Sequence, residues 1–249
     1  MDNASYLTDQ PFTDLDLAPE LIRGLETAGF SHCTQIQQLA LPLALAGKDV
    51  AGQAKTGTGK TAAFLLAIFN RLLRLSPHAE HGAKSVRAVV LAPTRELAIQ
   101  IHRDAVQLCQ HTALRMGLVY GGTGYQDQAE ALSHGVDILI GTPGRFIDFY
   151  KQGLFDLKGV QVLVLDEADR MFDLGFIRDI RYVLRRLPPP AERLNMLFSA
   201  TLSSRVNELA YEHMNDPISI QVESDTPVAD QLIEEVYYPA NEEKLGLLV

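Results

Sequence analysis

The sequence predicts an α/β protein with a mostly parallel sheet and helices on both faces. Short, continuously apolar runs recur at residues 86–92, 116–120, 136–140, 160–165 and 195–198. Such runs are typical of strands that are buried on both faces of a parallel sheet. Amphipathic stretches with helical spacing lie between them, at residues 96–108 and 176–187. This alternation indicates repeated strand–helix units, which bind ligands at the carboxyl ends of their strands.

The rest of the chain divides around this sheet. Residues 1–11 are polar and are expected to form a flexible extension, followed by helices at residues 19–28 and 35–46. The main domain is expected to cover residues 12–222 and to end on a strand at residues 218–222. Residues 223–231 are polar and are expected to be a linker. Residues 232–249 resemble the start of a second domain that is cut short.

Composition places the chain among soluble globular proteins, with 47% hydrophobic and 21% charged residues. No apolar run approaches the roughly 20 residues of a membrane span, and residues 1–11 lack the pattern of a signal peptide. Cys33 and Cys109 alone support neither a disulfide framework nor a cysteine-rich metal site. We therefore expect a cytoplasmic protein that does not contact membranes. The net charge of −9 argues against a generally cationic nucleic-acid binder, but it allows a local basic groove.

A glycine-rich stretch follows the strand that is predicted at residues 49–53. It reads Ala54-Lys55-Thr56-Gly57-Thr58-Gly59-Lys60-Thr61 and leads into a helix predicted at residues 61–75. The two glycines let backbone N–H groups turn toward an anion, and the helix N-terminus adds partial positive charge. Lys60 is expected to reach the terminal phosphates, and the Thr61 hydroxyl to coordinate Mg²⁺. The stretch therefore predicts a site for a nucleoside triphosphate.

Acidic residues follow the apolar run that ends at residue 165. Asp166 is expected to hold the Mg²⁺ that bridges the terminal phosphates, and Glu167 to orient or deprotonate the attacking water. Acids in this position also suit the first turn of a helix, and the phosphate loop is what favours the catalytic interpretation. We expect Asp169 to connect these acids with other motifs.

Asp166-Glu167-Ala168-Asp169 gives the chain a strong resemblance to the first RecA-like domain of a DEAD-box RNA helicase. Further matching stretches occur in the order of that family and span residues 12–201. They are Phe12 with Gly29-Phe30, Thr34, Ile36 and Gln37, then Pro93-Thr94-Arg95-Glu96-Leu97-Ala98, Gly121-Gly122, Thr142-Pro143-Gly144-Arg145 and Ser199-Ala200-Thr201. Cys33 stands where the family usually has proline. Residues 135–141, 169–176 and 194–198 further resemble the bacterial RhlB type, which is associated with mRNA turnover.

The resemblance implies ATP and Mg²⁺ as ligands of the residues 54–61 loop. The Gln37 amide has a donor and an acceptor, which suits the adenine edge. Phe12 either stacks on adenine or packs the N-terminal extension. Ser199 and Thr201 are expected to relay the state of the nucleotide to the RNA.

The resemblance also implies contacts to the backbone of one RNA strand, which position the strand without reading its sequence. The residues expected to make them are Pro93, Thr94, Arg95, Gly122, Thr142 and Arg145. For either arginine taken alone, a surface ion pair is the alternative.

The family's reaction is ATP hydrolysis coupled to local opening of RNA duplexes and remodelling of RNA–protein complexes, and the RNA-degradation machinery is an expected partner. A second RecA-like domain closes on the nucleotide and supplies arginine fingers, whose loss costs about 10³ to 10⁵ in rate in related hydrolases. No stretch resembles that domain's motifs, so we expect this chain alone to hydrolyse little ATP. Two alternatives remain: a nucleotide-dependent RNA-binding or scaffolding module without catalysis, and another P-loop ATPase.

Overall fold

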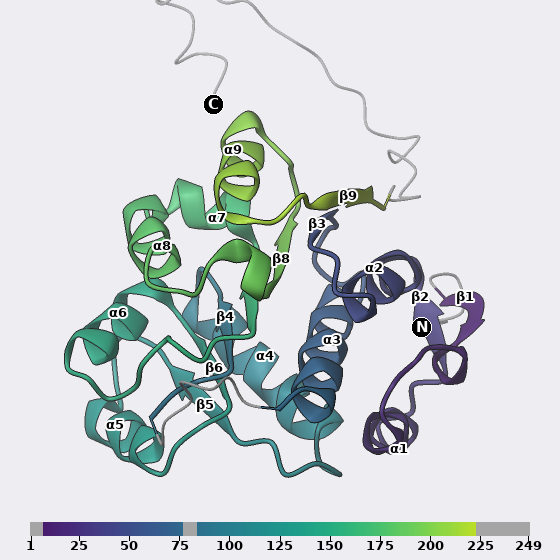
Figure 1. Ribbon diagram of the computed structural model, residues 1–249, viewed down its shortest axis with the longest axis horizontal. Coiled ribbons are helices and arrows are strands. Elements are labelled where there is room, and N and C mark those ends of the chain that lie inside the picture. Colours follow the sequence, from purple (N-terminus) through teal and green to yellow (C-terminus); the bar gives the residue numbers. More distant parts are fainter. Residues whose placement is uncertain (1–6, 77–83, 223–249) are drawn as a thin grey trace, which may run out of the picture.

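The computed structural model describes residues 7–76 and 84–222, and its main sheet has seven parallel strands (Figure 1). Their order across the sheet is β5-β6-β4-β7-β8-β3-β9. The predicted α/β class with a mostly parallel sheet is therefore confirmed. In chain order the strands are β3 (Val50–Gln53), β4 (Ala88–Leu91), β5 (Met116–Val119), β6 (Ile138–Gly141), β7 (Val162–Leu165), β8 (Leu194–Ser199) and β9 (Ile218–Gln221).

Helices cover both faces of this sheet. They are α1 (Pro19–Thr27), α2 (Gln35–Leu45), α3 (Lys60–Arg74), α4 (Arg95–Leu108), α5 (Tyr125–Ser133), α6 (Pro143–Lys151), α7 (Ala168–Asp173), α8 (Ile177–Leu184) and α9 (Ser204–His213). Successive side chains of a strand point to opposite faces, so each strand feeds two cores. Ala88 and Val90 pack in a cluster with α1 to α4, whereas Val89 and Leu91 pack in a cluster with α5 to α9.

The N-terminal extension is more ordered than the sequence suggests. The flexible segment was expected to reach residue 11, but β1 (Leu7–Pro11) pairs antiparallel with β2 (His32–Thr34). The Thr8 hydroxyl also donates to the Cys33 carbonyl at 2.9 Å. Residues 7–11 therefore form one strand of a two-stranded ribbon, and the expectation that they are flexible is wrong. Residues 1–6, the predicted linker at 223–231 and the tail at 232–249 lie outside the described residues.

The strand order decides which loops meet at the carboxyl edge of the sheet. β8 lies between β7 and β3, so the loops after these three strands are neighbours. β6 lies between β5 and β4, so the loops after those strands form a second group. The first group holds the predicted phosphate and acidic motifs, and the second holds the predicted RNA motifs. In the part of the chain that is described, no helix is both long and apolar enough to cross a membrane.

Candidate functional site

The glycine-rich loop runs from the end of β3 into the first turn of α3. The Ala54 N–H donates to the Ser199 carbonyl at 2.9 Å, which ties the start of the loop to β8. Gly57 and Gly59 have φ of 88° and 92°, in the left-handed region that favours glycine. At Gly59 a Cβ would also lie 2.6 Å from Nε2 of Gln37. Glycine is therefore required at position 59 by both the backbone and the neighbouring side chain.

Lys60 and Asp166 form a buried ion pair between the loop and the end of β7. Lys60 Nζ lies 2.9 Å from Asp166 Oδ1 and 3.9 Å from Glu167 Oε1. Lys60 and Asp166 are only 3% and 0% exposed. Burial raises the pKa of Asp166, while the Lys60 ammonium works in the opposite direction. Asp166 Oδ2 is buried and accepts no hydrogen bond from the described residues, so this oxygen is available to a ligand.

The residues around Asp166 fit a magnesium ion that arrives with a triphosphate. Among the described residues, no cluster of three or more His, Cys, Asp or Glu side chains could hold a metal by itself. Mg²⁺ is usually bound through one or two carboxylates, water and substrate phosphates. The unpartnered Asp166 Oδ2 and the Thr61 side chain, which lines the neighbouring cavity, supply oxygens of that kind.

Glu167 is held beside the glycine-rich loop by its backbone and two neighbours. Its φ of 51° is left-handed, an uncommon state for a residue with a side chain and one that concentrates at functional sites. Its Oε1 accepts from the Thr56 hydroxyl at 3.0 Å, and its Oε2 lies 3.4 Å from Arg170 Nη1. The two acids predicted from the sequence therefore lie next to the loop, with Asp166 buried and Glu167 partly exposed.

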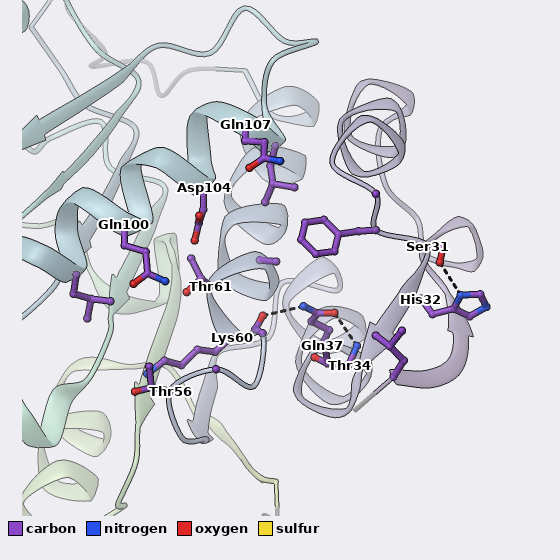
Figure 2. Close-up of a pocket in the computed structure, with 18 residues that line it drawn as sticks. Ser31, His32, Thr34, Gln37, Thr56, Lys60, Thr61, Gln100, Asp104 and Gln107 are labelled. Atoms are coloured by element: carbon purple, nitrogen blue, oxygen red, sulfur yellow. Dashed lines mark hydrogen bonds between the residues drawn. The ribbon is translucent and has the colours of Figure 1, made fainter. Parts of the chain in front are cut away.

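A cavity of about 520 Å³ opens beside the loop and is wide enough for a small ligand (Figure 2). Its floor is the loop and the start of α3, and its two walls come from the segment around β2 and from α4. It is lined by Leu7, Gly29, Phe30, Ser31, His32, Thr34, Gln37, Thr56, Gly57, Gly59, Lys60, Thr61, Ala62, Leu97, Gln100, Asp104, Gln107 and Leu108. Lys55 and Thr58 do not line it, although the Thr58 hydroxyl braces the loop by donating to the Lys55 carbonyl at 2.9 Å.

Gln37 connects the N-terminus of α2 with the glycine-rich loop. Its Oε1 accepts from the Thr34 N–H at 2.8 Å, and its Nε2 donates to the Gly59 carbonyl at 2.9 Å. Figure 2 shows both bonds as dashed lines. Because Nε2 carries two N–H groups, one donor is left for a ligand. Its role with adenine stays a prediction.

Phe12 and Phe30 differ in exposure, which bears on the two alternatives drawn for Phe12, stacking on adenine or packing the N-terminal extension. Phe12 is 3% exposed, packs in the core with α1 to α4 and does not line the cavity. In this structure it therefore packs the N-terminal segment, which is the alternative drawn from the sequence. Phe30 is 48% exposed and lines the cavity, so it is the aromatic ring that a ligand would meet.

Asp169 joins the loop after β7 to the loop after β8, as expected of a connector. Its Oδ2 accepts from the N–H and the hydroxyl of Thr201 at 3.0 and 3.2 Å. Its own N–H donates to the Ser199 hydroxyl, which in turn donates to the Thr201 carbonyl at 2.8 Å. Ser199 is fully buried, so its hydroxyl is held in place between Asp169 and Thr201.

The second group of loops presents two arginines that lie against aromatic rings. Arg95, at the start of α4, lies over the Tyr120 ring at 4.7 Å, and Thr94 caps the helix by accepting from the Leu97 N–H at 3.3 Å. Pro93 is buried at the end of β4 and does not face the surface. Gly122 has φ of 101°, and a Cβ there would lie 3.5 Å from Nη1 of Arg95. Space would allow a side chain at this position, and it is the left-handed backbone that favours glycine there.

Arg145 is held by residues that the sequence interpretation missed. It lies over the rings of Tyr125 and Phe149, at 4.7 and 5.3 Å. Its Nη1 is 3.4 Å from Oε1 of Gln128, a buried residue of α5. The Thr142 N–H donates to the Val119 carbonyl at 3.0 Å and so ties the start of α6 to β5. Tyr120 and Tyr125 flank a glycine-rich turn. Aromatic residues interleaved with glycines and arginines are a signal for nucleic-acid binding, and this signal could have pointed to them.

Comparison with known proteins identifies the family. The DEAD/DEAH box helicase family matches residues 34–209. The ATP-dependent RNA helicase RhlB of Pseudoalteromonas atlantica is 57% identical over 245 residues, which are 98% of this chain and 58% of that protein. The protein of the same name from Pectobacterium carotovorum is 57% identical over 244 residues, 98% of this chain and 57% of that protein.

A solved structure agrees with these relatives. The crystal structure of a DEAD box protein from the hyperthermophile Methanococcus jannaschii is similar with a TM-score of 0.76 and 33% identity, over 86% of this chain and 56% of that one. The predicted similarity to the bacterial RhlB type is confirmed by the relatives that bear this name. The chain spans 56–58% of the length of these relatives. It belongs to the DEAD/DEAH box helicase family.

Proposed function

We propose that this chain binds ATP with Mg²⁺ and one strand of RNA, and that it is the ATP-binding part of an RNA-dependent ATPase that opens short RNA duplexes. The observation that carries the proposal is the pairing of Lys60 with Asp166 at 2.9 Å between the loops after β3 and β7. Family membership and the name of the relatives, ATP-dependent RNA helicase, support it. Because the chain spans little more than half of those relatives, their complete activity is carried over as a proposal.

The nucleotide would bind with its phosphates on the loop at residues 54–61 and its nucleoside in the cavity. N–H groups of the loop and of the first turn of α3 would face the phosphates, and Lys60 would neutralise their charge. Thr61 and Asp166 would hold Mg²⁺, which when bound neutralises charge on the terminal phosphates. Phe30 would stack on the base, and Gln37 would offer its free N–H to the base edge.

Glu167 is the residue proposed to place the attacking water. Its carboxylate lies at the mouth of the phosphate loop and is oriented by Thr56 and Arg170. A carboxylate held in this way can accept a proton from water as the water attacks the terminal phosphate. The left-handed backbone at Glu167 supports this role, because strained residues persist where their surroundings hold them in place.

RNA would bind across the loops after β4, β5 and β6. Thr94, Arg95, Thr142 and Arg145, together with the backbone at Gly122, would contact successive phosphates. Such contacts position a strand and carry little sequence information. Pro93 would act through the shape of its turn, since its side chain is buried.

Asp169 bonds to Ser199 and Thr201, the two residues proposed to relay the state of the nucleotide to the RNA, and it follows the acids that would serve the nucleotide. We propose that a second RecA-like domain closes on this site, and that the protein acts in the cytoplasm with the RNA-degradation machinery. Residues 223–231 would be the linker and residues 232–249 the beginning of that domain.

The test is to measure ATP binding, RNA binding and RNA-stimulated ATP hydrolysis by the 249-residue chain. We expect weak binding of both ligands and low turnover, rising when a second RecA-like domain is added. Glu167→Gln should abolish this turnover and leave ATP binding intact. Glu192 is exposed and does not line the cavity, so Glu192→Gln should change neither the turnover nor ATP binding. Absence of ATP binding, or equal turnover of the Glu167→Gln variant, would refute the proposal. Equal affinity for single-stranded DNA and RNA would favour a general P-loop ATPase.

A further inference from the structure

The wall of the cavity opposite the β2 segment is one face of α4. It consists of Leu97, Gln100, Asp104, Gln107 and Leu108, which recur at the spacing of neighbours on a helix surface. Figure 2 shows Gln100, Asp104 and Gln107 on one side of the cavity, and Thr34 and Gln37 on the other. Gln100, Asp104 and Gln107 belong to none of the motifs from which the nucleotide site was predicted.

The Asp104 carboxylate has no hydrogen-bond donor among the described residues. Its side chain is partly buried, and burial raises the pKa of Asp104 while the neighbouring Arg103 lowers it. Neither Asp104 oxygen is among the fully buried atoms that lack a partner, so the carboxylate is accessible from the cavity that it lines. A carboxylate accepts hydrogen bonds and donates none, so it selects for a donor on the ligand.

The position of Asp104 along the cavity indicates which part of the ligand it would meet. Lys60 and Thr61, which are proposed to hold the phosphates, lie at the glycine-rich loop, and Phe30 is the exposed ring on the wall opposite α4. Asp104 lies one helical turn, about 6 Å, beyond Gln100 along α4 and away from the helix start. A nucleotide that extends from the loop therefore brings its nucleoside part, rather than its phosphates, toward Asp104.

We propose that Asp104 is a specificity-determining residue of the nucleotide pocket, whose carboxylate accepts a hydrogen bond from a donor of the nucleoside. The inference rests on the proposed ATP site and adds a second polar wall to it. The two donors assigned to this contact are the ribose 2′-hydroxyl and the amino group of the base. A ligand that replaces the donor with an acceptor would place two acceptors against each other, which is a way to reject the wrong partner.

The test compares Asp104→Ala with the unmodified chain in binding of ATP, 2′-deoxy-ATP and purine riboside triphosphate, which lacks the amino group. We expect Asp104→Ala to weaken ATP binding about three- to tenfold, as for loss of one charge-assisted hydrogen bond at a half-exposed site. The analogue that lacks the contacted donor should bind the unmodified chain correspondingly less well and should be indifferent to the substitution. Loss with only the deoxy analogue identifies a ribose hydroxyl, and loss with only the other identifies the base.

Three controls separate this inference from its foundation. Lys60→Ala should remove ATP binding, and if the unmodified chain binds no ATP, the proposed function itself fails. Asp104→Asn keeps an acceptor oxygen and should lie between the alanine variant and the unmodified chain. Asp173→Ala removes an exposed carboxylate elsewhere and should leave binding unchanged. If ATP binds normally to Asp104→Ala, or all three ligands lose affinity equally, the assignment of Asp104 is overturned while the ATP site stands.

Discussion

Replacing Gln128 by alanine should weaken RNA binding without removing any charge from the protein. Gln128 accepts from the Tyr120 N–H at 3.0 Å and donates to the Thr123 and Tyr120 carbonyls at 2.9 and 3.3 Å. The same Oε1 lies 3.4 Å from Nη1 of Arg145. One buried amide therefore holds both ends of the glycine-rich turn after β5 and one of the two arginines of the proposed RNA site.

The magnitude follows from the bonds that are lost. A typical hydrogen bond contributes about 0.5–1.5 kcal/mol net, so the three bonds to the turn together correspond to about 2–4 kcal/mol of stability. Only the part that orders the turn and Arg145 counts toward RNA. If that part is about 1.4 kcal/mol, RNA affinity falls about tenfold.

The salt dependence of RNA affinity distinguishes positioning from direct contact. Each phosphate neutralised on a single strand adds about 0.7 to the slope of log affinity against log salt. Arg145→Ala should lower this slope by about that amount because it removes a cation. Gln128→Ala should lower the affinity at every salt concentration and leave the slope unchanged.

Two further variants keep the reasoning refutable. Gln126→Ala removes an exposed glutamine from the same helix and should affect neither stability nor RNA. Gln128→Glu keeps the acceptor for Tyr120 but turns the donor into a second acceptor, so it should lose the bonds to the two carbonyls. The role of Gln128 would be disproved if its alanine variant, shown to be folded by circular dichroism, bound RNA as tightly as Gln126→Ala.

Four other predictions concern the nucleotide side and the N-terminal segment. Gly59→Ala should destabilise the fold by about 1–3 kcal/mol and abolish ATP binding, because residue 59 has φ of 92° and its Cβ would lie 2.6 Å from the Gln37 amide. The control Gly57→Ala places its Cβ within 4 Å of no other atom, so it should lower the stability less when both variants are compared by thermal unfolding. Ser199→Ala should retain ATP binding but lose most RNA stimulation of hydrolysis, measured with the second domain present. Burial raises the pKa of Cys33 from 9.0 to about 11, so native alkylation at pH 8 should be about 100-fold slower than in denaturant. Between pH 9 and 11 the unfolded thiol loses its proton first, so stability should fall with rising pH less steeply in Cys33→Ala.

The sequence predicted the elements whose pattern is local and strong. The five continuous apolar runs correspond to β4 to β8, and strands were also expected at residues 49–53 and 218–222, where β3 and β9 lie. The predicted helix at residues 96–108 corresponds to α4, Arg95–Leu108. Helices such as α5 and α9 were missed because few of their residues are apolar, and only three side chains of α9 are buried. The ribbon of β1 and β2 was missed because a two-stranded edge needs no buried face and leaves polar residues in its strands.

The candidate site divides in the same way. The glycine-rich loop and the acids after β7 were predicted, because each is a contiguous motif whose chemistry depends on adjacent residues. Gln128 and Asp104 could not be predicted, because each lies on a helix that is brought to the site only by the order of the strands. Phe12 and Phe30 show the same limit: both are aromatic, and only packing decides that one is buried and the other exposed.

The buried charge at Asp166 explains why a metal is expected to enter with the nucleotide rather than before it. Lys60 neutralises Asp166 at 2.9 Å, and this balance holds only while Lys60 faces no other anion. A triphosphate on the loop would compete for the same ammonium, and it would place several negative charges near a carboxylate that is fully buried. Leaving that carboxylate without a cation is costly, because unpaired charge in a buried site is strongly unfavourable. The unpartnered oxygen of Asp166 would hold a divalent cation, whose charge would restore the balance. The charge of the buried pair thus couples the two ligands, and neither should bind tightly without the other.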